Sequence, residues 1–256
     1  MKISQLGAQL FTLRDYLKTP SQVADTLKKV RQIGYEAVQV SGMCQIDEAE
    51  LCRMLDGEGL VCAATHEPAD MILDQPEKVA ERLDKLGCKY TAYPFPAGIE
   101  FKTKEDVLGL ASKLDAAGKV LYDAGKVLTY HNHSIEFQRI EDHLILDMIY
   151  DNTNMKYLQG EIDTYWVQHG GGNPIIWCEK LCERLPLLHM KDYTITERDK
   201  PTYVEVGSGN LDWKLIVDAA DTAGCEWYLV EQDECSGCPF DALKKSFDYI
   251  KANLVD

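Results

Sequence analysis

Short apolar runs alternate with amphipathic stretches along nearly the whole chain. Eight runs rich in β-branched and aromatic residues recur about every 30 residues, the length of one strand–helix unit. They are Ile3–Gln9, Tyr35–Val40, Leu60–His66, Cys88–Tyr93, Lys126–Tyr130, Met155–Ile162, Leu185–Met190 and Cys225–Val230. Strands that are almost continuously apolar are typical of a parallel sheet whose outer face is covered by helices.

Glycine separates the helix-like segments from the strands that follow them. It stands just before a predicted strand in five units, as Gly34, Gly59, Gly87, Gly125 and Gly224. A glycine after the last helical residue adopts a positive φ at little cost, which lets the chain turn back into a strand. Among the helices, we expect one capped by Ser21, one opened by the capping pair Thr103 and Asp106, and two over Leu211–Ala223 and Phe240–Leu254.

Eight strand–helix units predict a single (β/α)8 TIM barrel, an α/β fold, that occupies residues 1–256 as one domain. The length of 256 residues is typical of such a barrel. A doubly wound open sheet is the alternative, but no G-x-G-x-x-G follows the first strand, which weakens a dinucleotide-binding version. No linker or low-complexity segment divides the chain.

The composition limits the classes of molecule that the protein is expected to bind. The formal net charge is −15, from 42 acidic and 27 basic residues, and such a field disfavours nucleic acid and anionic membranes. With no long apolar span and no signal peptide at the start, we expect a cytoplasmic protein, and a homo-oligomer remains open. Nine cysteines include one C-x-x-C, Cys235 and Cys238, which without a second ligand pair predicts a reduced pair in a loop.

Candidate chemistry gathers where the predicted strands end, which is where TIM barrels carry their active sites. Four of the six histidines lie at these ends: His66, His131, His133 and His189. Carboxylates stand at the same ends. Histidine and carboxylate groups that converge on one barrel mouth need a cation to balance their charge, and mixed nitrogen and oxygen donors suit Mn, Co, Zn or Fe(II) better than Ca.

Several strand-end motifs, in order along the chain, resemble one known family. They are Leu6–Arg14, Tyr130–His133 with Glu136-Phe137, Glu161–Val167, Pro186–Tyr193, Glu205–Trp213 and Val230–Asp233. Over nearly its whole length the chain resembles the sugar phosphate isomerases/epimerases of the xylose isomerase-like TIM barrel superfamily. The resemblance implies a small carbohydrate substrate. It does not select among ketose epimerases, inosose dehydratases, keto-glycoside enzymes and DNA repair endonucleases, although the last would need more metal ligands than the sequence offers.

The same resemblance implies one divalent metal ion, Mn, Co, Zn or Mg. It carries three ligands over directly, Asp163, His189 and Glu231. The fourth is a glutamate on the fifth strand in better understood relatives, but His131 stands there, with Glu136 nearby. The fourth ligand is therefore His131 or Glu136. Trp166 stands where epimerases often have a histidine that contacts the substrate, so both departures speak against simple 3-epimerization.

The leading hypothesis is a metal-dependent sugar isomerase or epimerase that abstracts a proton next to a carbonyl. We expect Glu231 to be ligand and base, His131 or Glu136 to be the second acid or base, and Lys191 to neutralise an enolate or a phosphate. Expected substrate contacts are Arg14, His66, His133, Trp166 and Glu205. A rim lysine, a surface ion pair and a structural turn are the plainer interpretations of Lys191, Arg14 and Glu205. The alternatives are a lyase or hydrolase on a 3-keto glycoside, an inosose-type dehydratase, and a sugar-binding barrel without turnover.

Overall fold

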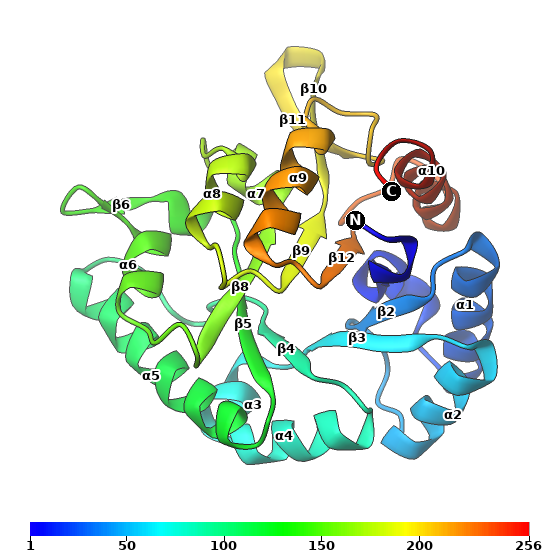
Figure 1. Cartoon of the computed structure of the whole chain (residues 1–256), viewed down its shortest axis with the longest axis horizontal. Helices are drawn as coiled ribbons and strands as arrows, with labels where there is room; N and C mark the ends of the chain where they lie inside the picture. Colours follow the sequence, from blue (N-terminus) through cyan, green and yellow to red (C-terminus); the bar gives the residue numbers. More distant parts are fainter. Residues whose placement is uncertain (256) are drawn as a thin grey trace.

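The computed structural model describes residues 1–255 and confirms the predicted TIM barrel (Figure 1). Eight parallel strands close into one barrel in the order β1-β12-β9-β8-β5-β4-β3-β2. The strands are β1 (Leu6–Gln9), β2 (Ala37–Val40), β3 (Val61–His66), β4 (Tyr90–Tyr93), β5 (Val127–His131), β8 (Leu158–Asp163), β9 (Leu187–Met190) and β12 (Trp227–Val230). First and last strands pair directly, since Leu6 lies opposite Tyr228.

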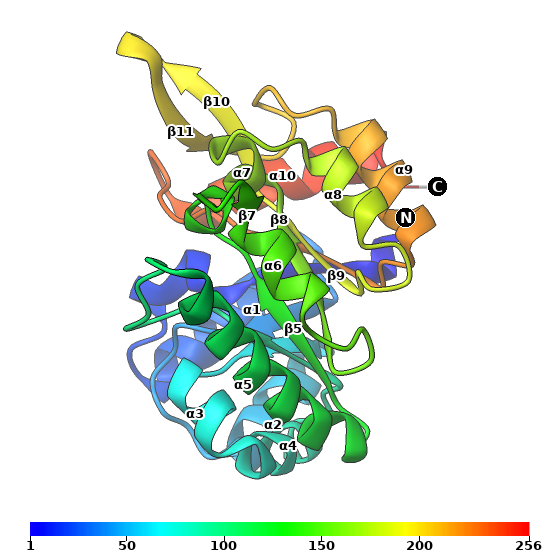
Figure 2. The same cartoon turned by 90° about the vertical axis from the view of Figure 1, so that its left-hand side faces the viewer.

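Helices surround the barrel on the outside (Figures 1 and 2). They are α1 (Pro20–Ile33), α2 (Glu48–Glu58), α3 (Ala69–Asp74), α4 (Pro76–Lys85), α5 (Lys104–Asp123), α6 (Ile145–Asp151), α7 (Thr164–His169), α8 (Pro174–Lys180), α9 (Trp213–Ala223) and α10 (Pro239–Asn253). Four short 3-10 segments join them, η1 (Ile3–Gln5), η2 (Leu10–Tyr16), η3 (Ile135–Phe137) and η4 (Glu197–Asp199). No helix within residues 1–255 is both long and apolar enough to cross a membrane.

Local signals set most boundaries as expected. Gly59 and Gly224 end α2 and α9 in the left-handed conformation, with φ of 66° and 92°. The capping box of Thr103 and Asp106 opens α5 as predicted. The expected cap at Ser21 is wrong: Thr19 caps α1, because Pro20 fits the first helical position, where no N–H is needed.

Other predicted ends shift by a few residues. The first predicted strand loses its beginning to η1, and the sixth starts at Leu158 rather than Met155. Helix α9 starts after Asp212, whose side chain accepts from Leu215 N, rather than at Leu211. The pattern also missed two hairpins, β6 (Arg139–Ile140) with β7 (His143–Leu144), and β10 (Asp192–Thr196) with β11 (Lys200–Val204). Figure 2 shows the β10–β11 hairpin extending away from the barrel.

The barrel interior is apolar toward the N-terminal ends of its strands. Six residues from five strands pack together there, and we refer to them as the inner apolar cluster: Ala37, Ala63, Ala64, Tyr90, Leu187 and Leu229. The larger core lies between the strands and the helices. Because side chains alternate along a strand, the next inward positions after Leu187 and Leu229 are His189 and Glu231. The apolar cluster thus supports the residues that carry the candidate chemistry.

Candidate active site at the barrel mouth

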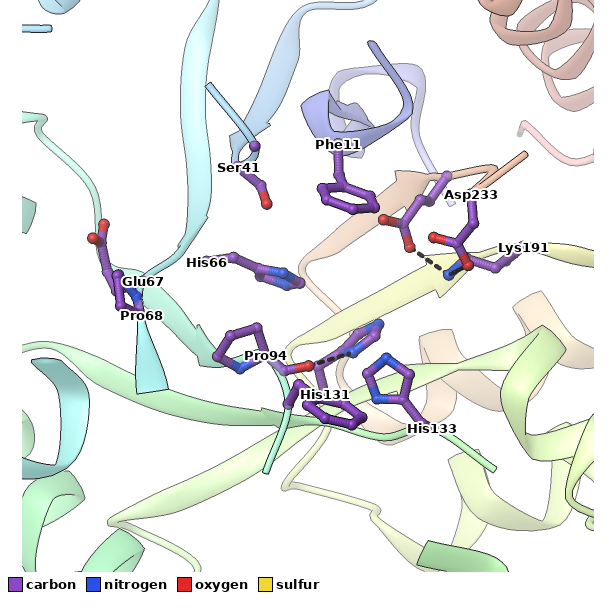
Figure 3. Close-up of a pocket in the computed structure, with 13 residues that line it drawn as sticks. Phe11, Ser41, His66, Glu67, Pro68, Pro94, His131, His133, Lys191 and Asp233 are labelled. Carbon is purple, nitrogen blue, oxygen red and sulfur yellow. Dashed lines mark hydrogen bonds and ion pairs between the residues drawn. The ribbon is translucent and has the colours of Figure 1, made fainter. Parts of the chain in front are cut away.

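A cavity of about 350 Å³ opens at the carboxyl ends of the strands. Of the residues expected at the site, it is lined by His66, His131, His133, Lys191 and Glu231. Figure 3 shows His66 reaching in from β3, with Lys191 and Asp233 on the far side and His131 and His133 below. Phe11 and Phe95 complete an aromatic rim. The strand ends therefore bring residues from distant parts of the chain to one cavity, as the barrel fold predicts.

Four buried side chains converge on one point at this mouth: His131, Asp163, His189 and Glu231. Nδ1 of His189 lies 3.1 Å from Nε2 of His131 and 3.0 Å from Oε2 of Glu231. Oδ2 of Asp163 lies 3.4 Å from Nε2 of His131 and 3.7 Å from Nδ1 of His189. Donors bound at about 2.1 Å to one tetrahedral ion lie about 3.4 Å apart, so these spacings fit a metal site.

Hydrogen bonds outside the cluster leave both ring nitrogens facing it as acceptors. Nδ1 of His131 donates to the carbonyl of Pro94 at 3.3 Å. Nε2 of His189 donates to Oε1 of Gln39 at 2.7 Å. The remaining nitrogens, Nε2 of His131 and Nδ1 of His189, therefore bring two lone pairs together, which is stable only with a cation or a proton between them. Oδ2 of Asp163, which lies 2.8 Å from the ammonium of Lys191, adds an oxygen donor on the same side.

The charges around the cluster also call for a cation. Lys191 is 1% exposed, and its Nζ lies 2.8 Å from Asp163 Oδ2, 2.6 Å from Glu231 Oε2 and 3.0 Å from Asp233 Oδ2. One ammonium facing three carboxylates leaves a deficit of two positive charges, which one divalent ion would supply. The residues present thus fit such an ion.

Protonation follows the same electrostatics. Burial lowers the pKa of His189, but Glu161 and Glu231 outweigh it and hold that pKa well above its usual range. Burial likewise opposes the charge of Lys191, and the three carboxylates overcome it, so its pKa is raised. Burial, His131 and Lys191 together lower the pKa of His133 to about 2, so its ring is neutral. Without an ion, therefore, a proton on His189 occupies the cation position.

Two residues on the cavity side escaped the sequence interpretation, Glu161 and Asp233. Glu161 is fully buried and accepts from Nε2 of His66 at 2.6 Å. Asp233 lines the cavity beside Lys191. Glu161 lies two residues before Asp163 on β8 and so on the same inward face of that strand, which was the signal available in the sequence. Asp233 lies in the loop after β12, where no strand period applies.

The expected residues do not all meet at this cavity. Glu136 lies apart from the cluster, where its carboxylate accepts from the hydroxyl of Tyr130 and from the backbone N–H of His133, both at 2.8 Å. Of the two candidates for the fourth ligand, only His131 belongs to the cluster. Burial raises the pKa of Glu136, and these hydrogen bonds oppose the rise.

Arg14, Trp166 and Glu205 do not line the cavity. The guanidinium of Arg14 donates to the carbonyls of Phe11 and Asp233, beside a neighbouring cavity. Glu205 pairs with Lys245 at 3.2 Å. The Trp166 ring packs 5.3 Å from that of His133.

Cys235 and Cys238 are free cysteines between β12 and α10.

Known proteins resemble this chain in sequence and in fold. No family model matches it. An inosose dehydratase of Clostridium beijerinckii is 27% identical over 62% of this chain and 58% of its own length, so the chain spans less than two thirds of that relative.

Among solved structures, a sugar phosphate isomerase/epimerase from Parabacteroides distasonis superposes with a TM-score of 0.84 at 22% identity, over 99% of this chain and 96% of that one. An L-ribulose 3-epimerase superposes with a TM-score of 0.75 at 16% identity, over 98% and 94%. At these identities the likeness concerns the fold. The comparisons therefore confirm the TIM barrel fold of the chain.

Proposed function

We propose that this protein is a divalent-metal-dependent sugar isomerase or epimerase that removes a proton next to the carbonyl of a keto-sugar. The observation that carries the proposal is the cluster of His131, Asp163, His189 and Glu231 at the barrel mouth, with its inward-facing lone pairs and its deficit of positive charge. These four residues would hold the ion. When bound, the ion would polarise the substrate oxygens and acidify the neighbouring C–H.

Glu231 is the proposed base. Its Oε2 is engaged by His189 and Lys191, whereas Oε1 has no hydrogen-bond partner among the described residues and belongs to a side chain that lines the cavity. Oε1 is therefore the atom that would take the proton. Lys191 would stabilise negative charge that develops on a substrate oxygen, because its ammonium lines the same cavity.

His66 is the proposed second proton carrier, in place of the fifth-strand glutamate of better understood relatives. Nε2 of His66 donates a hydrogen bond to Glu161, so Nδ1 is left as an acceptor. The ring of His66 lines the cavity. Figure 3 places His66 across the cavity from Lys191 and Asp233. Inversion at carbon requires proton carriers on opposite faces, and Glu231 with His66 would supply them.

A dehydratase is the second candidate, favoured by the similarity to an inosose dehydratase. The first step would be the same removal of the C–H proton by Glu231. The electron pair would then form a C=C bond as the neighbouring C–O bond breaks. The leaving hydroxide would depart as water with a proton from Nδ1 of His66, which has to take up that proton from solvent before the step. Both reactions thus share one site and diverge after the first proton transfer.

Metal content is the first test. Purified protein should carry about one divalent ion per chain, as ligand sets of this kind do, and Asp163→Ala or His189→Ala should strongly reduce it. Elemental analysis is the measurement. Protein that stays metal-free after incubation with Mn²⁺, Co²⁺ or Zn²⁺ would contradict the proposal.

Incubation in D₂O with a panel of ketoses, ketose phosphates and an inosose then separates the reactions. Deuterium uptake into a product of unchanged formula supports an isomerase or epimerase. Loss of one water supports the dehydratase. Metal binding without exchange or product from any of them would favour a sugar-binding barrel without turnover.

A further inference from the structure

Three polar side chains form a fully buried chain of hydrogen bonds below the barrel mouth. Gln9 on β1, Gln39 on β2 and Glu161 on β8 are each 0% exposed. Nε2 of Gln9 donates to Oε1 of Gln39 at 2.7 Å, and Nε2 of Gln39 donates to Oε1 of Glu161 at 2.6 Å. Three groups this polar are costly to bury, so each must be hydrogen-bonded, and each is.

The direction of this chain is fixed by its carboxylate. Ionised Glu161 can only accept, so the amide nitrogen of Gln39 must face it and the amide oxygen must face the other way. That oxygen receives hydrogen bonds from Gln9 and from Nε2 of His189. His189 is thereby held in the tautomer that leaves Nδ1 free as a donor atom for a metal ion.

The same carboxylate holds a second ring. Oε2 of Glu161 accepts from Nε2 of His66, while Oε1 is occupied by Gln39. The rings of His66 and His189 stack nearly parallel, with centroids 5.4 Å apart and planes 11° apart. One buried chain therefore contacts both a residue of the metal cluster and the histidine across the cavity.

We propose that Gln9, Gln39 and Glu161 are positioning residues that set the metal affinity of the barrel mouth, with Gln39 as the central member. This inference rests on the proposed metal site. Gln39 holds the ring of His189 in the orientation and tautomer that bind an ion, and Glu161 aligns His66 beside it. Changes to such outer partners commonly weaken metal binding by about 10- to 100-fold.

The test compares Co²⁺ affinity in wild type and Gln39→Met. Methionine has nearly the size of glutamine but makes no equivalent hydrogen bonds, so the barrel stays filled while His189 loses its acceptor. Calorimetric titration of metal-free protein with Co²⁺ should show a Kd about 10- to 100-fold weaker than wild type. In ¹⁵N-imidazole spectra of the Zn²⁺-loaded protein, the Nε2 proton of His189 should exchange slowly in wild type and quickly in the variant.

The matched control is Thr65→Val. Thr65 and Thr91 form a hydrogen bond of 2.9 Å, both at 0% exposure, on the neighbouring strands β3 and β4 of the same barrel. Neither side chain is hydrogen-bonded to His131, Asp163, His189 or Glu231. Its loss should lower the melting temperature but leave both the Co²⁺ Kd and the His189 exchange unchanged. If Gln39→Met fails to fold, Gln9→Met removes the outer member alone and should weaken Co²⁺ binding in the same direction by a smaller factor.

The outcomes separate the two levels of the proposal. A wild-type protein that binds no Co²⁺ overturns the proposed metal site itself. A wild type that binds Co²⁺, with Gln39→Met and Gln9→Met binding it equally well, leaves the metal site standing and overturns the positioning role.

Discussion

The two ends of the barrel interior are built from the same strands but differ in chemistry. Leu187 and Leu229 belong to the inner apolar cluster. His189 and Glu231, two residues further along the same strands, belong to the group of four candidate metal ligands. A step of two residues keeps a side chain on the inward face and moves it about 7 Å along the strand. The fold therefore places apolar packing and concentrated charge on one scaffold.

The two ends also differ in how completely their buried polar side chains are hydrogen-bonded. Within residues 1–255, the buried side-chain N and O atoms without a hydrogen-bond partner lie near the mouth, on Asn132, His133, Asp163 and Trp166. The Asp163 oxygen still has the ion pair with Lys191, whereas each of the other three atoms costs about 1–3 kcal/mol in a folded protein. The mouth is thus arranged for binding at some cost in stability, and the apolar end offsets that cost.

Of the substitutions considered, Glu231→Gln should have the largest effect on activity at the barrel mouth. The glutamine keeps the size and one oxygen donor but removes the basic group, so turnover and substrate–solvent exchange should fall by about 10²–10⁴. Metal binding should weaken only partly and the fold should persist. Deuterium exchange with the substrate that responds in the panel is the measurement. Glu234→Gln, an exposed carboxyl three residues away, is the control. Near-normal exchange in Glu231→Gln would place the base elsewhere.

Leu229→Ala tests the other end of the same strand. Leu229 is 0% exposed inside the barrel, and truncating such a leucine costs about 2–5 kcal/mol in transfer and cavity energy. Urea unfolding should show this loss, while the Co²⁺ Kd of the folded protein should stay at the wild-type value. A large loss of metal affinity in Leu229→Ala would mean that the two ends are not separable.

The sequence was enough to predict the barrel because its signals are local and repeated. Glycine at helix ends and eight apolar runs at even spacing each depend on a few neighbouring residues, and the closed barrel confirms them. The shifts at Thr19 and Leu158 arise where caps and register depend on contacts beyond the local pattern. The β10–β11 hairpin was missed because its strands lack an apolar run and, apart from Asp192, are exposed or half-buried.

The site was predictable by position but not by partner. Strand ends pointed to His66, His131, His189 and Glu231, which the structure brings together. Arg14 and Glu205 lie at the carboxyl-terminal end of the barrel, as predicted. Their orientations follow from the contact of Arg14 with Asp233 and of Glu205 with Lys245, which no sequence motif indicates. The polar chain through Gln39 was invisible for the same reason, since β2 reads as an ordinary strand.

The smallest effect is expected from Glu136→Gln, which sharpens the choice of the fourth ligand. His131 is in the cluster and Glu136 is not, so His131→Ala should lose metal while Glu136→Gln keeps the wild-type Co²⁺ Kd. For stability, burial raises the pKa of Glu136 above the unfolded value of about 4.3. A protein with such a carboxyl loses stability as the pH rises from the pKa of the group in the unfolded chain toward its pKa in the folded protein, because the group ionises first in the unfolded chain. The glutamine cannot ionise. The free energy of unfolding of Glu136→Gln should therefore rise relative to that of wild type as the pH increases from acidic to neutral, as urea unfolding at several pH values would show. A weaker Co²⁺ Kd in Glu136→Gln than in His131→Ala would reverse the assignment.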